Sequence, residues 1–249
     1  MQPAFAVTLQ AMQQDLARVQ SIAANLANAG TVGFKREVAA ARPFADLVRA
    51  ASDAAAAPAG AGGLAIVTDP HVGTLKFTGH PFDVAFAGDG LFEVQTERGP
   101  AYTRQGSFRV DARGRLVTAH GDAVMGQGGE IVLAKTAVTI DAAGRILDAD
   151  ALADGSSARP LAQLRVVQPD DRAALKRLGD GLLGADGAVT PMADSAFEVR
   201  QGYLENSNVN PMQEMVQLMQ ALRHFESLQK VAQGTDDMLG TAIHKLGEL

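Results

Sequence analysis

The sequence predicts an α+β protein, in which long N- and C-terminal helices form a coiled-coil stem around an all-β middle domain. Near both ends of the chain, apolar residues recur every three or four positions, which is the spacing of one helix face. Between them lie short segments of alternating polarity separated by glycine-containing turns, a pattern typical of antiparallel sheets. Four segments follow: residues 1–30, 31–63, 64–201 and 202–249.

The first segment, residues 1–30, is predicted to be the N-terminal helix of the stem. Gly30 is expected to end it as a left-handed cap. The apolar face that would contact other helices is formed by Phe5, Leu9, Met12, Leu16, Val19, Ile22 and Leu26.

Residues 31–63 are predicted to be an extended connector followed by a flexible linker. Gly33 and Phe34 lie in a turn, and Pro43 discourages a helix before it. A short helix fits residues 44–57. The Ala- and Gly-rich residues 58–63 have little to bury and are therefore assigned as the linker.

Residues 64–201 are predicted to form the all-β body. The turns fall at residues 88–90, 111–114, 126–129 and 141–144, and the first and third are interpreted as hairpin turns. The strands are expected at residues 82–86, 91–95, 101–104, 107–110, 115–118, 131–133, 138–140, 164–168 and 196–200.

Residues 202–249 lead into the second helix of the stem. Asn210 is a suitable N-cap, Pro211 suits the first helical position, and Gln233-Gly234 is expected to interrupt the helix. The apolar face comprises Met215, Leu218, Leu222, Phe225, Leu228, Leu239 and Leu246. A helix of about 57 Å is longer than one globular core requires, so this face needs a partner. Pairing of the two terminal helices is preferred over the alternative, in which each packs on the body as a lid.

Composition limits the function classes. The formal net charge of −6 argues against nucleic acid as the main partner. The chain has no cysteine, which excludes disulfides, thiol nucleophiles and zinc–thiolate sites. No apolar run is long enough for a membrane span, and the start of the chain lacks the pattern of a cleaved secretory signal.

No catalytic, metal or cofactor site is predicted. The glycine turns lack the Lys-Ser/Thr of a nucleotide loop, and the five histidines lack metal-binding spacing. Asp148, Asp150 and Asp154 faintly resemble a calcium loop, but Leu152 and Arg159 occupy ligand positions. Scattered carboxylates could still meet in space, as in glycosidases, although no pattern supports an enzyme.

Three ordered motifs resemble the rod and hook proteins of the bacterial flagellum. The first is Asn25-Leu26-Ala27-Asn28 with Thr31 and Gly33-Phe34-Lys35-Arg36. The second runs from Phe82 through Gly88-Asp89-Gly90 to Gly106-Ser107-Phe108, and the third from Gly202-Tyr203-Leu204-Glu205 through Asn208 and Asn210-Pro211 to Val216. Within this family the chain is most similar to proximal-rod members, because of its length and Asn210-Pro211; distal-rod members are the runner-up.

The resemblance implies a structural subunit without enzymatic activity, cofactor, small-molecule substrate, nucleic-acid partner or membrane insertion. Such subunits polymerise through their terminal helices into a torque-transmitting tube that crosses the periplasm. Their partners are other rod subunits and the flagellar type III export apparatus, which exports them without a cleaved signal peptide. A different class remains open: a soluble β-domain with a binding or hydrolytic face, which oligomerises through its helices.

Overall fold

The computed structural model describes residues 2–41, 64–135, 137–150, 159–170, 175–185 and 187–247. It divides into two compact units. The helical unit comprises Met1–Ala27, Glu37–Asp69 and Val209–Leu249, and the β unit comprises Asn28–Arg36 and Pro70–Asn208. The α+β class is confirmed. These limits differ from the predicted segment boundaries, and the short helix and linker predicted within residues 44–63 lie outside the described residues.

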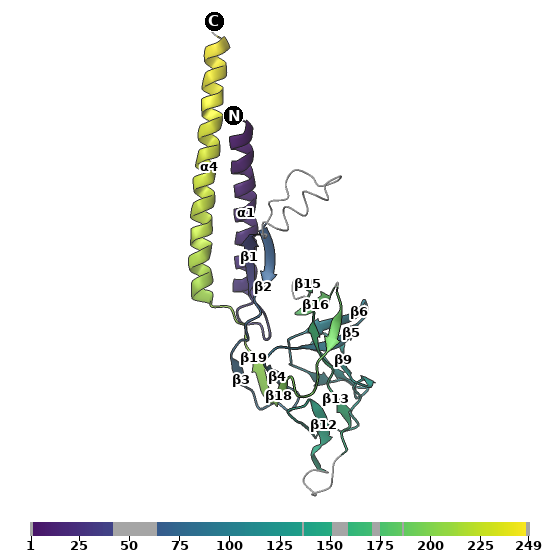
Figure 1. Ribbon diagram of the computed structural model, residues 1–249. Helices are drawn as coiled ribbons and strands as arrows, with labels where there is room; N and C mark the ends of the chain where they lie inside the picture. Colours follow the sequence, from purple (N-terminus) through teal and green to yellow (C-terminus); the bar gives the residue numbers. More distant parts are fainter. Residues whose placement is uncertain are drawn as a thin grey trace. The chain divides into compact units, whose positions relative to one another are not determined.

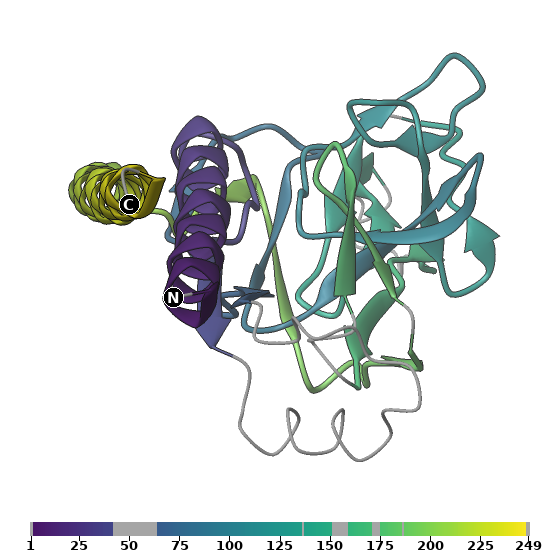
Figure 2. The ribbon, with the colours of Figure 1, turned by 90° about the horizontal axis from the view of Figure 1, so that it is seen from above.

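The helical unit is built on two long helices, α1 (Gln2–Ala27) and α4 (Pro211–Gly247). They lie side by side and antiparallel, and the far end of α4 extends past the start of α1 (Figures 1 and 2). Strands β1 (Glu37–Ala41) and β2 (Leu64–Thr68) form an antiparallel ribbon in the same unit, and both contact α1.

The observed helix ends agree only in part with those predicted from the sequence. Asn210 caps α4 as predicted, because its Oδ1 accepts the backbone N–H of Met212 at 3.1 Å. The predicted interruption at Gly234 is wrong, since α4 continues through it. The predicted left-handed cap at Gly30 is also wrong. The first left-handed glycine after α1 is Gly33, with φ of 68°.

The β unit contains seventeen named strands among the described residues, all paired antiparallel. They are β3 (Leu75–Phe77), β4 (Val84–Ala87), β5 (Leu91–Thr96), β6 (Gly99–Thr103), β7 (Arg109–Val110), β8 (Leu116–Val117), β9 (Ala123–Gly126), β10 (Gly129–Glu130), β11 (Val138–Ile140), β12 (Arg145–Asp148), β13 (Ala162–Gln163), β14 (Val166–Pro169), β15 (Leu175–Gly179), β16 (Leu182–Ala185), β17 (Val189–Pro191), β18 (Glu198–Gln201) and β19 (Tyr203–Glu205).

The largest sheet runs in the order β15-β16-β6-β5-β9-β8-β7, with β10 on β9, β14 on β5 and β17 on β14. Smaller sheets pair β11-β12-β13, β18-β4 and β19-β3. The β4–β18 and β3–β19 pairs join the start of the unit to its end. The chain enters and leaves the β unit through paired strands.

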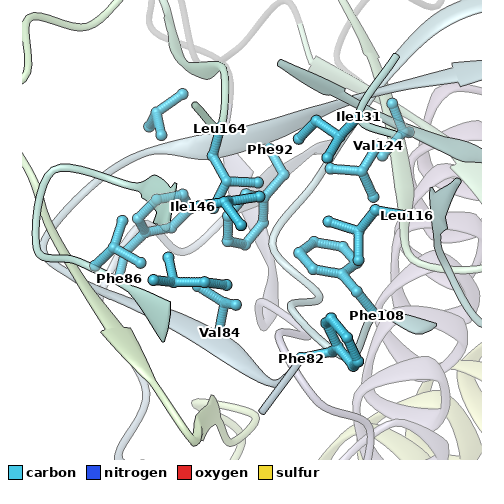
Figure 3. Packing of buried hydrophobic residues seen from close by; sticks show 14 of the residues in the cluster. Phe82, Val84, Phe86, Phe92, Phe108, Leu116, Val124, Ile131, Ile146 and Leu164 are labelled. Atoms are coloured by element: carbon cyan, nitrogen blue, oxygen red, sulfur yellow. The ribbon is translucent and has the colours of Figure 1, made fainter. Parts of the chain in front are cut away.

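One apolar cluster lies at the centre of the β unit (Figure 3). Phe86 stacks on Phe92 with ring centroids 4.2 Å apart, and Phe108 meets Phe92 edge-on at 5.0 Å. Aliphatic side chains from other parts of the unit, including Leu116, Ile146 and Leu164, surround the rings (Figure 3). Alternation in β5, where Phe92 and Val94 are buried, supplies this core as the sequence predicted.

Two predicted β features differ from the structure. The turn at residues 88–90 does not close a hairpin, because β4 pairs with β18 while β5 pairs with β6, β9 and β14. Instead, the Arg104 guanidinium donates to the carbonyls of Gly88 and Gly90 and holds the turn open. Residues 131–133 form only an isolated bridge at Val132. The hairpin turn at residues 126–129 is confirmed by the β9–β10 pair.

Candidate assembly interface

The contact between α1 and α4 has one register along its length. Asn25 Nδ2 donates to Glu214 Oε2 at 3.1 Å, and Asp15 Oδ2 lies 2.5 Å from His224 Nδ1. The two residue numbers of each pair add up to 239, as antiparallel helices without a register shift require. By this rule, the last α4 residue opposite described α1 is Asp237.

The face of α4 that contacts α1 holds only some of the residues predicted for the interface. Leu218, Phe225 and Leu228 are half-buried, and Ala221 is buried. They share this face with buried Glu214. Because a helix turns by about 100° per residue, Leu222 lies well away from Ala221 around the axis.

A second apolar face of α4 is exposed, and we call it the outer face. Met215 and Leu222, both predicted for the interface, belong to it with exposures of 47% and 44%. It also includes Met212, Val216 and Met219, which the prediction missed, with exposures of 72%, 44% and 52%. The first three turns of α4 are therefore apolar on two sides, and α1 covers one of them.

The predicted residues of α1 are also divided. Ile22 is buried, and Met12, Val19 and Leu26 are half-buried, whereas Leu9 and Leu16 are about half exposed. The side chains of Phe5, Leu239 and Leu246 lie outside what the structure describes.

The first sequence motif (residues 25–36) contacts the third (residues 202–216) inside each unit. In the helical unit, Asn25 is fully buried and bonds both sides of the Glu37 backbone: its Oδ1 accepts the N–H at 2.7 Å and its Nδ2 donates to the carbonyl at 2.8 Å. Its bond to Glu214 adds α4. One side chain therefore joins α1, β1 and α4.

In the β unit, the same motif reaches the end of β19 through a buried ionic cluster. The Glu205 carboxylate is buried and accepts from Lys35 Nζ at 2.7 Å, from Arg104 Nε at 2.5 Å and from the Gly73 N–H at 2.8 Å. Lys35 Nζ also donates to the His71 carbonyl at 2.7 Å. Burial lowers the pKa of Lys35, and the hydrogen bond and charge of Glu205 oppose that effect.

Backbone contacts complete this junction. Gly33 donates its N–H to the Glu205 carbonyl at 2.7 Å, and Asn208 Oδ1 accepts the Arg36 N–H at 2.7 Å. The Arg177 guanidinium covers the Phe34 ring at 4.3 Å. Near the motif's other end, Thr31 Oγ1 donates to Asn28 Oδ1 at 3.2 Å. The motif residues therefore fasten the segments by which the chain enters and leaves the β unit.

The sequence analysis missed the partners of these motif residues. Arg104 falls within the second motif, but nothing in the sequence joins it to Glu205. Likewise, nothing in the sequence joins Asp15, Glu37 or His224 to its partner. Their signal was weak: Asp15 interrupts an otherwise apolar helix face. A carboxylate at such a position must have a partner or be solvated.

The described residues contain no group of three or more His, Cys, Asp or Glu side chains that could hold a metal ion. Within the same residues, no helix is both long and apolar enough to cross a membrane. The features that require explanation are therefore the paired helices, their outer face and the two motif junctions.

Comparison with known proteins identifies the family. Residues 200–244 match the family described as flagellar basal body rod FlgEFG protein C-terminal, and residues 85–148 match the flagellar hook protein FlgE/F/G D1 domain. The chain is 32% identical to the flagellar basal-body rod protein FlgF of Escherichia coli, over 97% of each chain.

Two further relatives have similar identity. The chain is 30% identical to FlgF of Caulobacter vibrioides, over 92% of this chain and 91% of that protein. It is 32% identical to the flagellar basal-body rod protein FlgG of Agrobacterium fabrum, over 94% and 96% respectively. With identities of 30–32% over more than 90% of each chain, the chain belongs to the family of flagellar basal-body rod proteins.

Proposed function

We propose that this chain is a subunit of the proximal rod, that it polymerises through a coiled-coil stem of α1 and α4, and that the rod so formed transmits torque. Family membership makes it a structural protein of the flagellar basal body rather than an enzyme, with other rod components as partners. The proposal adds the surface used for assembly and the place in the rod.

The outer face of α4 is the observation that carries the mode of assembly. It exposes Met212, Met215, Val216, Met219 and Leu222, which would otherwise be costly to leave in water on a helix. Burying such a face in a neighbouring subunit is favourable at about 25 cal/mol per Å² of apolar area. Methionine suits a contact with neighbours of different shape, because its unbranched side chain adapts to the partner.

The place in the rod rests on a narrower argument. Chain length and the Asn210-Pro211 pair resemble proximal-rod members, and Asn210 does cap α4. Relatives named FlgF and FlgG match at similar identity, so a distal-rod subunit is the alternative. The proposal includes a rod that spans the periplasm and export by the flagellar type III apparatus, as the resemblance implies.

Deletion of the gene in the native bacterium tests both parts. We expect non-swimming cells whose purified basal bodies lack the rod from its proximal end outward, as seen by electron microscopy. Basal bodies with an intact proximal rod and a missing distal part would favour the alternative. Swimming cells with complete basal bodies would contradict a structural role in the rod.

A further inference from the structure

We propose that two polar side-chain pairs, Asn25–Glu214 and Asp15–His224, set the register in which α1 pairs with α4. The apolar faces of the two helices supply attraction, but their residues recur at similar intervals and match in more than one alignment. The polar pairs match in only one. They are therefore the specificity-determining contacts of the helix pair.

The first pair is completely removed from water. Asn25 is 0% exposed and Glu214 is 1% exposed, and their side chains meet at 3.1 Å. Moving either residue opposite an apolar side chain would leave a buried polar group without this bond. Glu214 would then lose a buried hydrogen-bond donor, and losing one partner of a buried charged group costs more than the bond contributes when it is made.

The second pair lies ten residues further along each helix, or about 15 Å along the axis. The Asp15 side chain is 8% exposed, whereas that of His224 is 62% exposed, so the pair lies at the border of the contact. Because the residue numbers of both pairs have the same sum, both pairs form in the same alignment of the two antiparallel helices. Any shift of one helix along the other therefore breaks both pairs at once.

A shift of one heptad shows what the pairs exclude. If α1 moved seven residues towards the C-terminus of α4, Asn25 would face Ala221 and Asp15 would face Val231. Both polar side chains would then lie against apolar ones. The opposite shift places Asn25 beyond Pro211, the first residue of α4, and so shortens the helix contact by about two turns.

The register has a consequence for assembly that rests on the proposed function. In the observed register, α4 continues for about ten residues beyond the start of α1. A heptad shift towards the C-terminus of α4 would cover most of that extension. The polar pairs therefore keep the end of α4 available to a neighbouring subunit. A single buried polar residue is known to fix register in coiled coils at some cost in stability.

Cysteine cross-linking of the full chain tests the register directly, since the natural sequence contains no cysteine. Ala11→Cys with Leu228→Cys reports the observed register, because these numbers also add up to 239. Ala11→Cys with Thr235→Cys reports a shift of one heptad. All three positions are half-buried. A heptad is about 10 Å along the axis, beyond the reach of a disulfide in the wrong register.

The test variant is Asp15→Leu/Glu214→Leu/His224→Leu. It removes both interhelical polar contacts but keeps Asn25, whose amide remains bonded to the Glu37 backbone. The matched control is Gln13→Leu/Gln220→Leu/Gln229→Leu, which adds the same number of leucines at exposed positions of the same helices.

We expect the wild type and the control to form the 11–228 disulfide on mild oxidation and almost no 11–235 disulfide. In the test variant, the ratio of the first to the second should fall at least about tenfold. An unchanged ratio would overturn the proposal, because chain connectivity alone would then set the register. Loss of both disulfides together with helical circular dichroism would also overturn it, because the pairs would be needed for pairing itself. The result is independent of motility, so it can fail while the rod function stands.

Discussion

The half-buried Lys35 Nζ and the buried Glu205 Oε1 form an ion pair at 2.7 Å, although 170 residues separate them in sequence. Arg104 Nε binds the other carboxylate oxygen at 2.5 Å, so one buried carboxylate serves two cations. This cluster closes the β unit where the chain enters and leaves it. The stability of the β unit therefore depends on contacts between residues that are far apart in the sequence.

Replacing Glu205 by glutamine should destabilise the β unit strongly. The change leaves Lys35 and Arg104 without their anionic partner in a buried site, and breaking a buried ion pair costs about 3–5 kcal/mol. Urea unfolding of the full chain measures the loss. Glu198→Gln is the control, because Glu198 pairs with Arg200 at the exposed surface and should contribute less than about 1 kcal/mol. Equal losses for the two variants would contradict the role of the cluster.

Gly33 should be intolerant of a side chain. Its φ of 68° is left-handed, and an added Cβ would lie 2.7 Å from the Arg104 carbonyl carbon. We expect Gly33→Ala to lower the free energy of unfolding by more than about 2 kcal/mol. Gly30→Ala is the matched control, because its added Cβ has no atom within 4 Å apart from its own chain neighbours, and its φ is not left-handed. A Gly33→Ala protein as stable as Gly30→Ala would disprove the close approach.

Two turns of the β unit should make its stability depend on acid pH. Backbone hydrogen bonding from Arg115, together with its guanidinium, lowers the pKa of Asp111 below the usual 3.8. Partial burial raises the pKa of Asp141, but hydrogen bonds from the side chain and backbone of Arg145 outweigh it and lower the pKa. Since both pKa values are lowered on folding, the stabilisation is complete above about pH 4 and is lost as the pH falls through the lowered values.

Thermal unfolding at pH 6 and pH 3 measures this effect. The double variant Asp111→Asn/Asp141→Asn lacks both titrating groups, so its melting temperature should fall less between the two pH values than that of the wild type. The same fall in both proteins would show that other carboxylates cause the acid sensitivity.

Local sequence signals predicted the elements whose cause is local. Helix periodicity, the Asn210 cap and the glycine turns at residues 111–114 and 141–144 depend on residues a few positions apart. Gly114 and Gly144 are left-handed, with φ of 79° and 73°. These features required no knowledge of the rest of the chain.

Strand pairing could not be predicted in the same way. The turn at residues 88–90 looks like a hairpin turn, but Arg104 binds its carbonyls and β4 pairs with β18 more than a hundred residues later. Register and partner choice depend on contacts distant in sequence. The outer face of α4 was missed for a related reason: spacing alone placed Leu222 with Leu218 and Phe225, whereas the position of α1 divides them between two faces.

Swimming of cells that carry Leu222→Asp tests the central claim, assembly through the outer face of α4, most directly. Leu222 is 44% exposed, so the change should alter the unfolding free energy of the purified chain by no more than about 0.5 kcal/mol. In a rod, the same carboxylate would be buried without a partner at a cost of several kcal/mol per subunit contact. Gln220→Glu, which is also exposed on α4, is the control and should swim normally. We predict a folded Leu222→Asp protein and non-swimming cells; normal swimming with Leu222→Asp would contradict assembly through this face.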